Sequence, residues 1–272
     1  MKLTLINILL FGFITPCFAQ NNAKTEIYVV GNIHDSVSNY TPGILFKILD
    51  GIKPSVILHE VDSASMKEYV GDIYKKGNEI QASNLFVKKY PKTQRLSFDF
   101  EGRNQYRKDK GMVPTDNLTE KLIDSLYKAN ALNKEHSVIY KRFSDLTQKL
   151  MDIALLSPEN FNNSITDGVS KERQEYQYKE LLKIVNERPE FLSNTITKPN
   201  GEKISYRDGF KLMCDFWDLR NRSMAKHIYN AAQKYKGQKI VVLTGFLHRY
   251  YLISELKRFN KEEYSIKEYY QH

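Results

Sequence analysis

The sequence has few cysteines and, after its first residues, no long hydrophobic run. It contains two cysteines, Cys17 and Cys214. If an N-terminal signal is removed, only Cys214 remains, which excludes an intramolecular disulfide. Cys214 lies in a helical pattern beside apolar residues, and we expect it to be a core residue. No later stretch is apolar enough to span a bilayer, so we predict no transmembrane segment. Low-complexity segments are also missing, and the 41% hydrophobic content is enough for a sizeable core.

The first nineteen residues have the order of a secretory signal. A lysine precedes a short apolar core, and Ala19 is a small residue at the expected cleavage point. The apolar core is shorter than a membrane span. We therefore predict a signal peptide over residues 1–19 and a secreted or periplasmic single domain over residues 20–272. Lipid anchoring through Cys17 is the alternative, but Pro16 is unlike the small residue that usually precedes a lipidated cysteine.

The chain is basic, with 41 Lys and Arg against 32 Asp and Glu. A positive surface can indicate an anionic partner such as nucleic acid. The lysines are scattered in pairs, however, such as Lys75-Lys76 and Lys88-Lys89, rather than gathered in one stripe. We interpret the excess charge as a solvated surface and predict no nucleic-acid partner.

Two short apolar runs, far apart in the chain, end in the same way. Residues 26–30 run into Gly31-Asn32-Ile33-His34, and residues 239–244 run into Gly245-Phe246-Leu247-His248. An apolar run closed by glycine is typical of a buried strand in a parallel sheet covered by helices. Ligands of such sheets bind outside the carboxyl ends of the strands. We expect both histidines to lie there.

Strands and helices alternate in the first hundred residues. We expect strands over 24–30, 54–58 and 95–98, and helices over 42–49, 65–76 and 82–89. This spacing is that of βαβ units, and it predicts an α/β protein with a mostly parallel central sheet flanked by helices.

The middle of the chain follows a different pattern. From residue 117 to about 188, apolar residues recur at helical spacing without a strand-like run, and Asn200-Gly201 marks a turn. We predict a helical insertion over about 117–205, between two halves of the sheet. The expected elements after it are a helix over 206–235, a strand from 240, a helix over 249–258 and an edge strand over 264–266.

Ionisable residues follow the predicted strands. Histidine can act near neutral pH as a base, a proton donor or a metal ligand, so His34 and His248 are paired candidates. Glu60 follows the second strand, where a buried carboxylate needs a partner or a ligand. Its neighbour His59 points to the opposite face, and we interpret it as a structural histidine with satisfied hydrogen bonds. Arg220 could clamp a carboxylate or stabilise an oxyanion.

Two carboxylates follow the third strand. Asp99 and Glu101 are two residues apart and should face the same side. They either support the site residues from behind or bind Arg103 at the surface.

These residues resemble an ordered family pattern. Two GxxH motifs, Glu60 between them, and Arg220-Asn221-Arg222-Ser223-Met224 in a helix look like the motifs of the erythromycin-esterase/ChaN-like/Tiki superfamily, particularly its TraB/GumN-type members. The resemblance covers nearly the whole mature chain and rests on motif order and spacing. It implies an α/β fold with a variable helical insertion and a site built from His34, Glu60, Arg220 and His248. Secondary candidates are Gly31, Asp99, Glu101, Asn221 and Gly245.

Activities within the superfamily diverge. Tiki-like members are described as divalent-metal-dependent proteases, erythromycin esterases hydrolyse a lactone with an active-site histidine, and ChaN-like members bind haem. The resemblance implies a hydrolase that cleaves a peptide or an ester or lactone bond in a peptide or small-molecule substrate. We predict the metal-dependent version, in which His34, Glu60 and His248 hold Mn²⁺, Co²⁺ or Zn²⁺. In a metal-free version, one histidine activates water, Glu60 orients it and Arg220 stabilises the oxyanion.

Two other classes of function stay open. A haem- or iron-binding protein would use an exposed tyrosine or histidine as axial ligand, and Tyr250-Tyr251 follow His248. A catalytically silent binding module is the other, although ionisable groups gathered at strand exits are usually kept for function. The sequence does not predict an oligomeric state.

Overall fold

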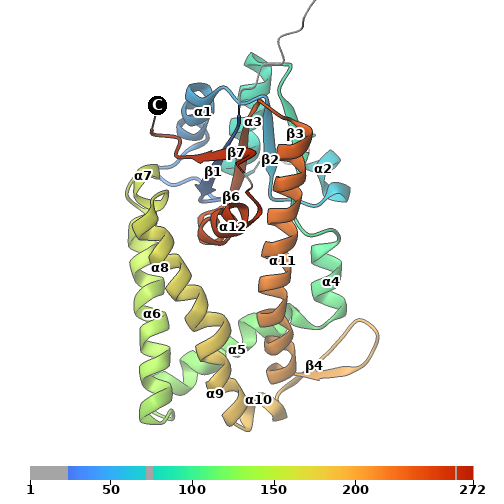
Figure 1. The fold of residues 1–272 in the computed structure, drawn as a ribbon. Coiled ribbons are helices and arrows are strands. Elements are labelled where there is room, and N and C mark those ends of the chain that lie inside the picture. Colours follow the sequence, from blue (N-terminus) through green and yellow to red (C-terminus); the bar gives the residue numbers. More distant parts are fainter. Residues whose placement is uncertain (1–23, 72–75, 261, 272) are drawn as a thin grey trace, which may run out of the picture.

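The computed structural model describes residues 24–71, 76–260 and 262–271. Its centre is a five-stranded, all-parallel sheet with the strand order β3-β2-β6-β1-β7 (Figure 1). The strands are β1 (Thr25–Asn32), β2 (Val56–His59), β3 (Gln94–Ser97), β6 (Lys239–Gly245) and β7 (Tyr264–Lys267). The predicted parallel α/β fold is confirmed. The predicted signal peptide lies outside the described residues.

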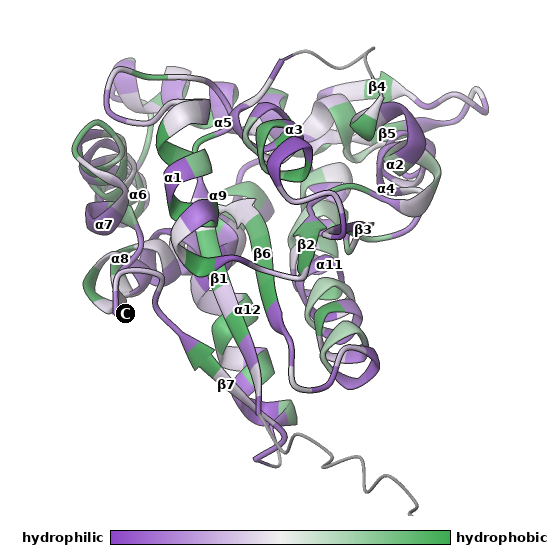
Figure 2. Ribbon diagram, turned by 90° about the horizontal axis from the view of Figure 1, so that it is seen from above, coloured by the Kyte–Doolittle hydropathy of each residue, from purple (hydrophilic) through white to green (hydrophobic). Residues whose placement is uncertain are grey.

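Strand β6, which comes late in the sequence, lies between β2 and β1, which both come early. Asn32 at the end of β1 pairs with Gly245 at the end of β6, and His59 of β2 pairs with Leu243. The carboxyl ends of the three central strands therefore meet at one edge of the sheet. Figure 2 shows β6 as hydrophobic along much of its length, as expected for a strand covered on both faces.

Helices cover both faces of the sheet because alternate strand residues point to opposite sides. On one face, Ile27, Val29 and Val242 pack against α11 (Tyr206–Lys234) and α12 (Phe246–Phe259). On the other face, Tyr28 and Val241 pack against α1 (Pro42–Ile52) and α3 (Asn78–Lys89).

The chain between β3 and β6 is mainly helical and extends away from the sheet (Figure 1). The elements are α4 (Arg103–Asp109), α5 (Met112–Lys128), α6 (Lys134–Ala154), α7 (Pro158–Phe161), α8 (Ser164–Glu175), η1 (Tyr176–Glu180), α9 (Leu181–Glu187), α10 (Glu190–Ser193), β4 (Thr195–Thr197) and β5 (Lys203–Ser205). The core of this region is formed by α5, α6, η1, α9, α10 and the first part of α11, and it includes the buried Cys214, as predicted. A small antiparallel hairpin, β4-β5, surrounds the predicted turn at Asn200-Gly201.

Three predicted helix starts were wrong near the site: α2 (Ser63–Val70) was expected over residues 65–76, α3 from residue 82 and α12 from residue 249. Helix α2 (Ser63–Val70) is capped by Asp62, whose side chain accepts a hydrogen bond from the backbone of Ser65. Helix α12 begins at Phe246, directly after β6, and not at residue 249. His248 therefore lies in the first turn of a helix, which fixes its backbone. Among the described residues, no helix combines the length and apolar character needed to cross a membrane.

Candidate functional site

The four primary candidates converge around Gly245. A Cβ atom placed on Gly245 would lie 3.3 Å from His34 Nε2, 3.8 Å from Glu60 Oε2 and 3.8 Å from His248 Cδ2. Arg220 contacts both Glu60 and His248. A side chain at position 245 would therefore fill the centre of the cluster, and glycine leaves that space open.

Arg220 is the hub of the cluster. Its Nε and Nη2 atoms donate to Asp99 at 2.8 and 2.9 Å, Nη2 also donates to Glu60 Oε1 at 2.6 Å, and Nη1 donates to His248 Nε2 at 3.0 Å. Asp99 is buried and also binds Arg103 at 2.9 Å. Asp99 therefore supports Arg220, as the first alternative predicted, and it pairs with Arg103 as a buried carboxylate rather than at the surface.

Both carboxylate oxygens of Glu60 are engaged. Oε1 accepts from Arg220, and Oε2 accepts from the Thr244 hydroxyl and the Gly245 backbone N–H, each at 2.7 Å. Burial alone would raise the pKa of Glu60, but its positive neighbours, including Arg220, and the Thr244 hydrogen bond lower the pKa well below its usual range. Glu60 is therefore an ionised anchor that fixes Arg220 and the end of β6.

His248 is held at both ring nitrogens. Asn221 donates to the Trp217 carbonyl through Nδ2, so its Oδ1 atom accepts from His248 Nδ1 at 2.7 Å. This leaves His248 Nε2 as the acceptor for Arg220. Trp217 stacks on the imidazole with a centroid distance of 4.4 Å. Burial lowers the pKa of His248 to about 3, so the ring is neutral at ordinary pH.

Of the two GxxH histidines, His34 is the one with a free ring nitrogen. Its Nδ1 atom is 2.7 Å from Glu79 Oε1, and Nε2 has no hydrogen-bond partner among the described residues. The hydrogen bond with Glu79 raises the pKa of His34 to about 9. The His34 side chain is 65% exposed, whereas the Glu79 side chain is 8% exposed. A buried carboxylate thus orients a histidine whose other nitrogen faces solvent.

Sequence reasoning missed Glu79. The helix that carries it was predicted to begin at residue 82, but α3 begins at Asn78. The Asn78 amide binds the carbonyls of Ile33, Asp35 and Tyr40, which pins the start of α3 to the loop that carries His34. A Gly-Asn-Glu start could have suggested a helix N-terminus, but nothing in the sequence pairs Glu79 with His34.

The remaining predicted residues divide between the site and its surroundings. Gly31 lies beside α12, where a Cβ atom would come within 2.8 Å of Phe246 Cβ, so only glycine permits this close packing. Asn221 holds His248, as described above. Glu101 does not join the cluster, because it is exposed and accepts hydrogen bonds from Ser63.

The interpretation of His59 was only partly right. The ring is fully buried and contacts Tyr69, with a centroid distance of 5.1 Å. Neither ring nitrogen has a hydrogen-bond partner among the described residues, so the prediction that the hydrogen bonds of His59 are satisfied is wrong. Burial lowers the pKa of His59 to about 3, and the ring is uncharged at ordinary pH.

A cleft of about 600 Å³ opens over the cluster. One side is formed by the strand exits, and the other by the helical insertion, which contributes Arg173, Gln177 and Tyr178. Arg103 also lines the cleft. The sequence indicated the insertion but not that it forms a wall of the site.

The three predicted metal ligands do not form an open coordination set as they are arranged. Glu60 and His248 Nε2 are committed to Arg220, whose positive charge lies where a cation would bind. Only His34 Nε2 is free. Among the described residues, no group of three or more His, Cys, Asp or Glu side chains is arranged to hold a metal ion. Tyr250 and Tyr251, the tyrosines of the haem alternative, line a neighbouring cavity instead.

Comparisons of the chain with protein-family models, with curated proteins and with solved structures find no match. The function is therefore inferred from the residues of the cleft.

Proposed function

We propose that the protein is a secreted or periplasmic hydrolase of the erythromycin-esterase/ChaN-like/Tiki type, which cleaves an ester, lactone or peptide bond without a bound metal. The observation that carries this proposal is the His34–Glu79 pair at the edge of a cleft that is also lined by three arginines. A histidine oriented by a buried carboxylate is suited to general-base catalysis, and arginine is suited to stabilise an oxyanion.

In the proposed reaction, neutral His34 takes a proton from water through Nε2. The water oxygen attacks the scissile carbonyl carbon, and Glu79 stabilises the imidazolium through its hydrogen bond with Nδ1. His34 then gives the proton to the leaving oxygen or nitrogen as the bond from carbon breaks. Because its pKa is about 9, only a minor fraction of His34, roughly 1%, is neutral at pH 7.

Arg103 and Arg220 are the groups proposed to stabilise the oxyanion. Arg220 uses four hydrogen bonds to hold Asp99, Glu60 and His248, which fixes its guanidinium in place. Arg103 uses Nη1 for Asp99 and Nε for Asn104. Its Nη2 group has no hydrogen-bond partner among the described residues, which leaves it to bind substrate. Fixed donors stabilise developing charge without reorganisation during the reaction.

The test is hydrolysis of a panel of esters, lactones and peptides by the mature protein and by His34→Asn. Asparagine keeps a donor for Glu79 but lacks Nε2. We expect kcat/KM of His34→Asn to fall by about 100-fold or more. The wild-type rate should rise with pH towards about 9, because the basic form of His34 is the active one. His227→Asn is the matched control, since His227 binds the Phe98 carbonyl and does not line the cleft.

Two results would contradict the proposal. If no member of the panel is hydrolysed, or if His34→Asn is as active as wild type, His34 is not the base of a hydrolase. Treatment with a chelator separates the two versions of the mechanism. Unchanged activity is expected, whereas loss of activity with recovery on adding Mn²⁺, Co²⁺ or Zn²⁺ would replace the metal-free version with the metal-dependent one.

A further inference from the structure

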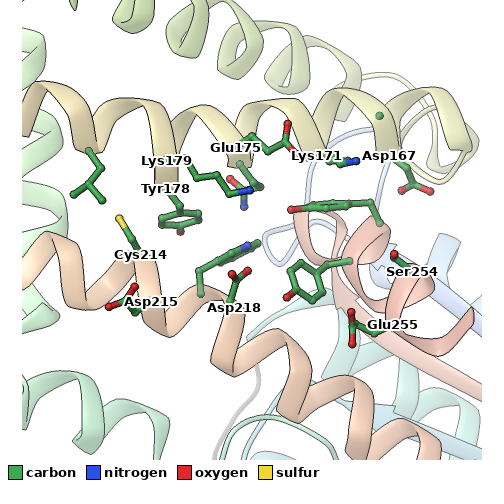
Figure 3. A pocket seen from close by; sticks show the side chains of 16 residues that line it. Asp167, Lys171, Glu175, Tyr178, Lys179, Cys214, Asp215, Asp218, Ser254 and Glu255 are labelled. Carbon is green, nitrogen blue, oxygen red and sulfur yellow. The ribbon is translucent and has the colours of Figure 1, made fainter. Parts of the chain in front are cut away.

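A second cavity of about 650 Å³ lies next to the reaction cleft. It lies between α8 and η1 on one side and α11 and α12 on the other, as Figure 3 shows. Gln174, Tyr178 and Trp217 line both the cavity and the cleft, so they form a shared wall. None of the roles proposed above uses this cavity.

Trp217 has two stacking partners within the shared wall. Its indole stacks on Tyr178, with a centroid distance of 4.9 Å, and on His248, with a centroid distance of 4.4 Å. Aromatic surface for a ligand is supplied by Tyr250 and Tyr251, which line the cavity from α12.

The cavity is acidic although the whole chain is basic. Five carboxylate residues line it, against two lysines, whereas the formal net charge of the protein is +9. Asp167 and Glu255 are neutralised by ion pairs with Arg249 and Arg258. The other three are Glu175, Asp215 and Asp218.

Two of these carboxylates are available to a ligand on the α11 side. Asp215 forms no ion pair with another described residue. Asp218 is 3.8 Å from Arg222, an exposed and weak pair, and it also accepts a hydrogen bond from the Tyr251 hydroxyl. In Figure 3 both lie on α11, opposite the α8 and η1 side that carries Lys171 and Lys179. One side of the cavity is therefore negatively charged next to aromatic surface.

We propose that this cavity binds an organic cation with an apolar body. An ammonium or guanidinium group binds at Asp215 and Asp218, and the hydrocarbon part packs on Tyr250 and Tyr251. Such a ligand is the non-reacting end of the substrate, because the cavity shares a wall with the cleft. This last step rests on the proposed hydrolase function, but binding of the cation does not.

The test uses Trp217, which is the only tryptophan of the chain and lies in the shared wall. Cyclohexylmethylammonium is titrated into the protein, and binding is followed by tryptophan fluorescence and by calorimetry. The uncharged cyclohexylmethanol serves as the matched ligand. We expect the amine to bind at least about tenfold more tightly than the alcohol, and the Asp215→Asn/Asp218→Asn variant to lose about the same factor. Lys179→Gln, on the opposite wall, should not weaken binding.

The outcomes separate this proposal from the hydrolase proposal. His34→Asn should bind the amine as wild type does, because His34 does not line the cavity. Amine binding that depends on the two aspartates, found without hydrolysis of any substrate, supports the cavity and contradicts only the hydrolase. If the alcohol binds as tightly as the amine, if the double variant binds as tightly as wild type, or if neither method detects binding, the cation site is wrong.

Discussion

At the residue scale, the cleft separates side chains that hold others from one that is free to react. Glu60, Arg220 and His248 satisfy one another, and burial keeps His248 neutral. His34 has one nitrogen bound to Glu79 and one open to the cleft. The two GxxH motifs look alike in sequence, yet one histidine has a positioning role and the other is available for chemistry.

The pKa of His34 should depend on Glu79. In wild type we expect His34 to titrate near pH 9, because the hydrogen bond with the Glu79 carboxylate stabilises the imidazolium. In Glu79→Gln the negative charge is lost, and the pKa should fall towards the ordinary value of 6.5. The rising limb of the pH–rate profile should move down with it. NMR titration of the imidazole resonances measures the shift, and His34→Asn assigns the signal.

The control for this prediction is Glu187→Gln. Glu187 is an exposed carboxylate that binds another histidine, His136, in the helical insertion. Its loss should leave the titration of His34 unchanged. A His34 pKa near 6.5 in wild type, or one that stays near 9 in Glu79→Gln, would show that Glu79 does not set the proton affinity of the base.

At the element scale, the sequence predicted where the central strands end. It did not predict which helices contact the residues at those ends. Apolar runs closed by Gly31 and Gly245 identified β1 and β6, and parallel pairing then places both ends at one edge of the sheet. The start of α3 was missed because Asn78 and Glu79 are polar and give no periodic signal. Their positions are set by contacts with a distant loop, which local sequence patterns do not encode.

Asn162 connects the helical insertion to strand β1 of the sheet through two hydrogen bonds. Its Oδ1 atom accepts from the Gly31 backbone N–H at 2.6 Å, and its Nδ2 group donates to the Gly31 carbonyl at 3.0 Å. Asn162→Ala leaves both buried backbone groups without these partners, so we expect a loss of about 2–4 kcal/mol in the free energy of unfolding. Urea unfolding measures it. Asn162→Asp keeps the acceptor but loses the donor, so its free energy of unfolding should differ from that of Asn162→Ala.

Asn160→Ala is the matched control for this prediction. Asn160 is exposed, and within the described part of the chain its side chain binds only the nearby Ser157 hydroxyl. Its loss should therefore change the free energy of unfolding by less than about 0.5 kcal/mol. Equal unfolding midpoints for wild type and Asn162→Ala would show that the pairing with Gly31 does not fasten the insertion.

At the scale of the whole molecule, the insertion supplies what the sheet alone lacks. Arg173 and Gln177 close the cleft, and Tyr178 separates the cleft from the second cavity. Helical spacing was enough to predict that residues 117–205 are mainly helical. It could not predict which helix faces the strand exits, because that depends on packing between surfaces that are distant in sequence. The walls of the two cavities therefore emerged only from the structure.

Two buried histidines, His59 and His248, should make the folded protein less stable in acid. His59 and His248 have a pKa of about 3 in the folded protein and about 6.5 when unfolded, so each contributes stability that is present above pH 6.5 and lost as pH falls. The pKa shift of His34 makes stability depend on pH in the opposite direction. Its raised pKa contributes stability that is present below pH 6.5 and lost as pH rises towards about 9. When wild type is acidified, the stability gained through His34 therefore offsets part of the stability lost through His59 and His248. The His34→Asn variant removes that gain.

In the His34→Asn background we expect the free energy of unfolding to fall by about 1.4 kcal/mol for each of the two buried histidines between about pH 7.5 and about pH 5.5. The total is about 2.7 kcal/mol. Adding His59→Phe should halve that pH dependence, because a phenyl ring fills the same apolar space without taking up a proton when the chain unfolds. Urea unfolding at the two pH values measures both variants. Since Glu60 is lost as a stabilising carboxylate only below about pH 4.5, it does not contribute in this window. An unchanged free energy of unfolding between the two pH values would show that His59 and His248 take up protons while the protein remains folded, and that the cluster around Arg220 is open to solvent.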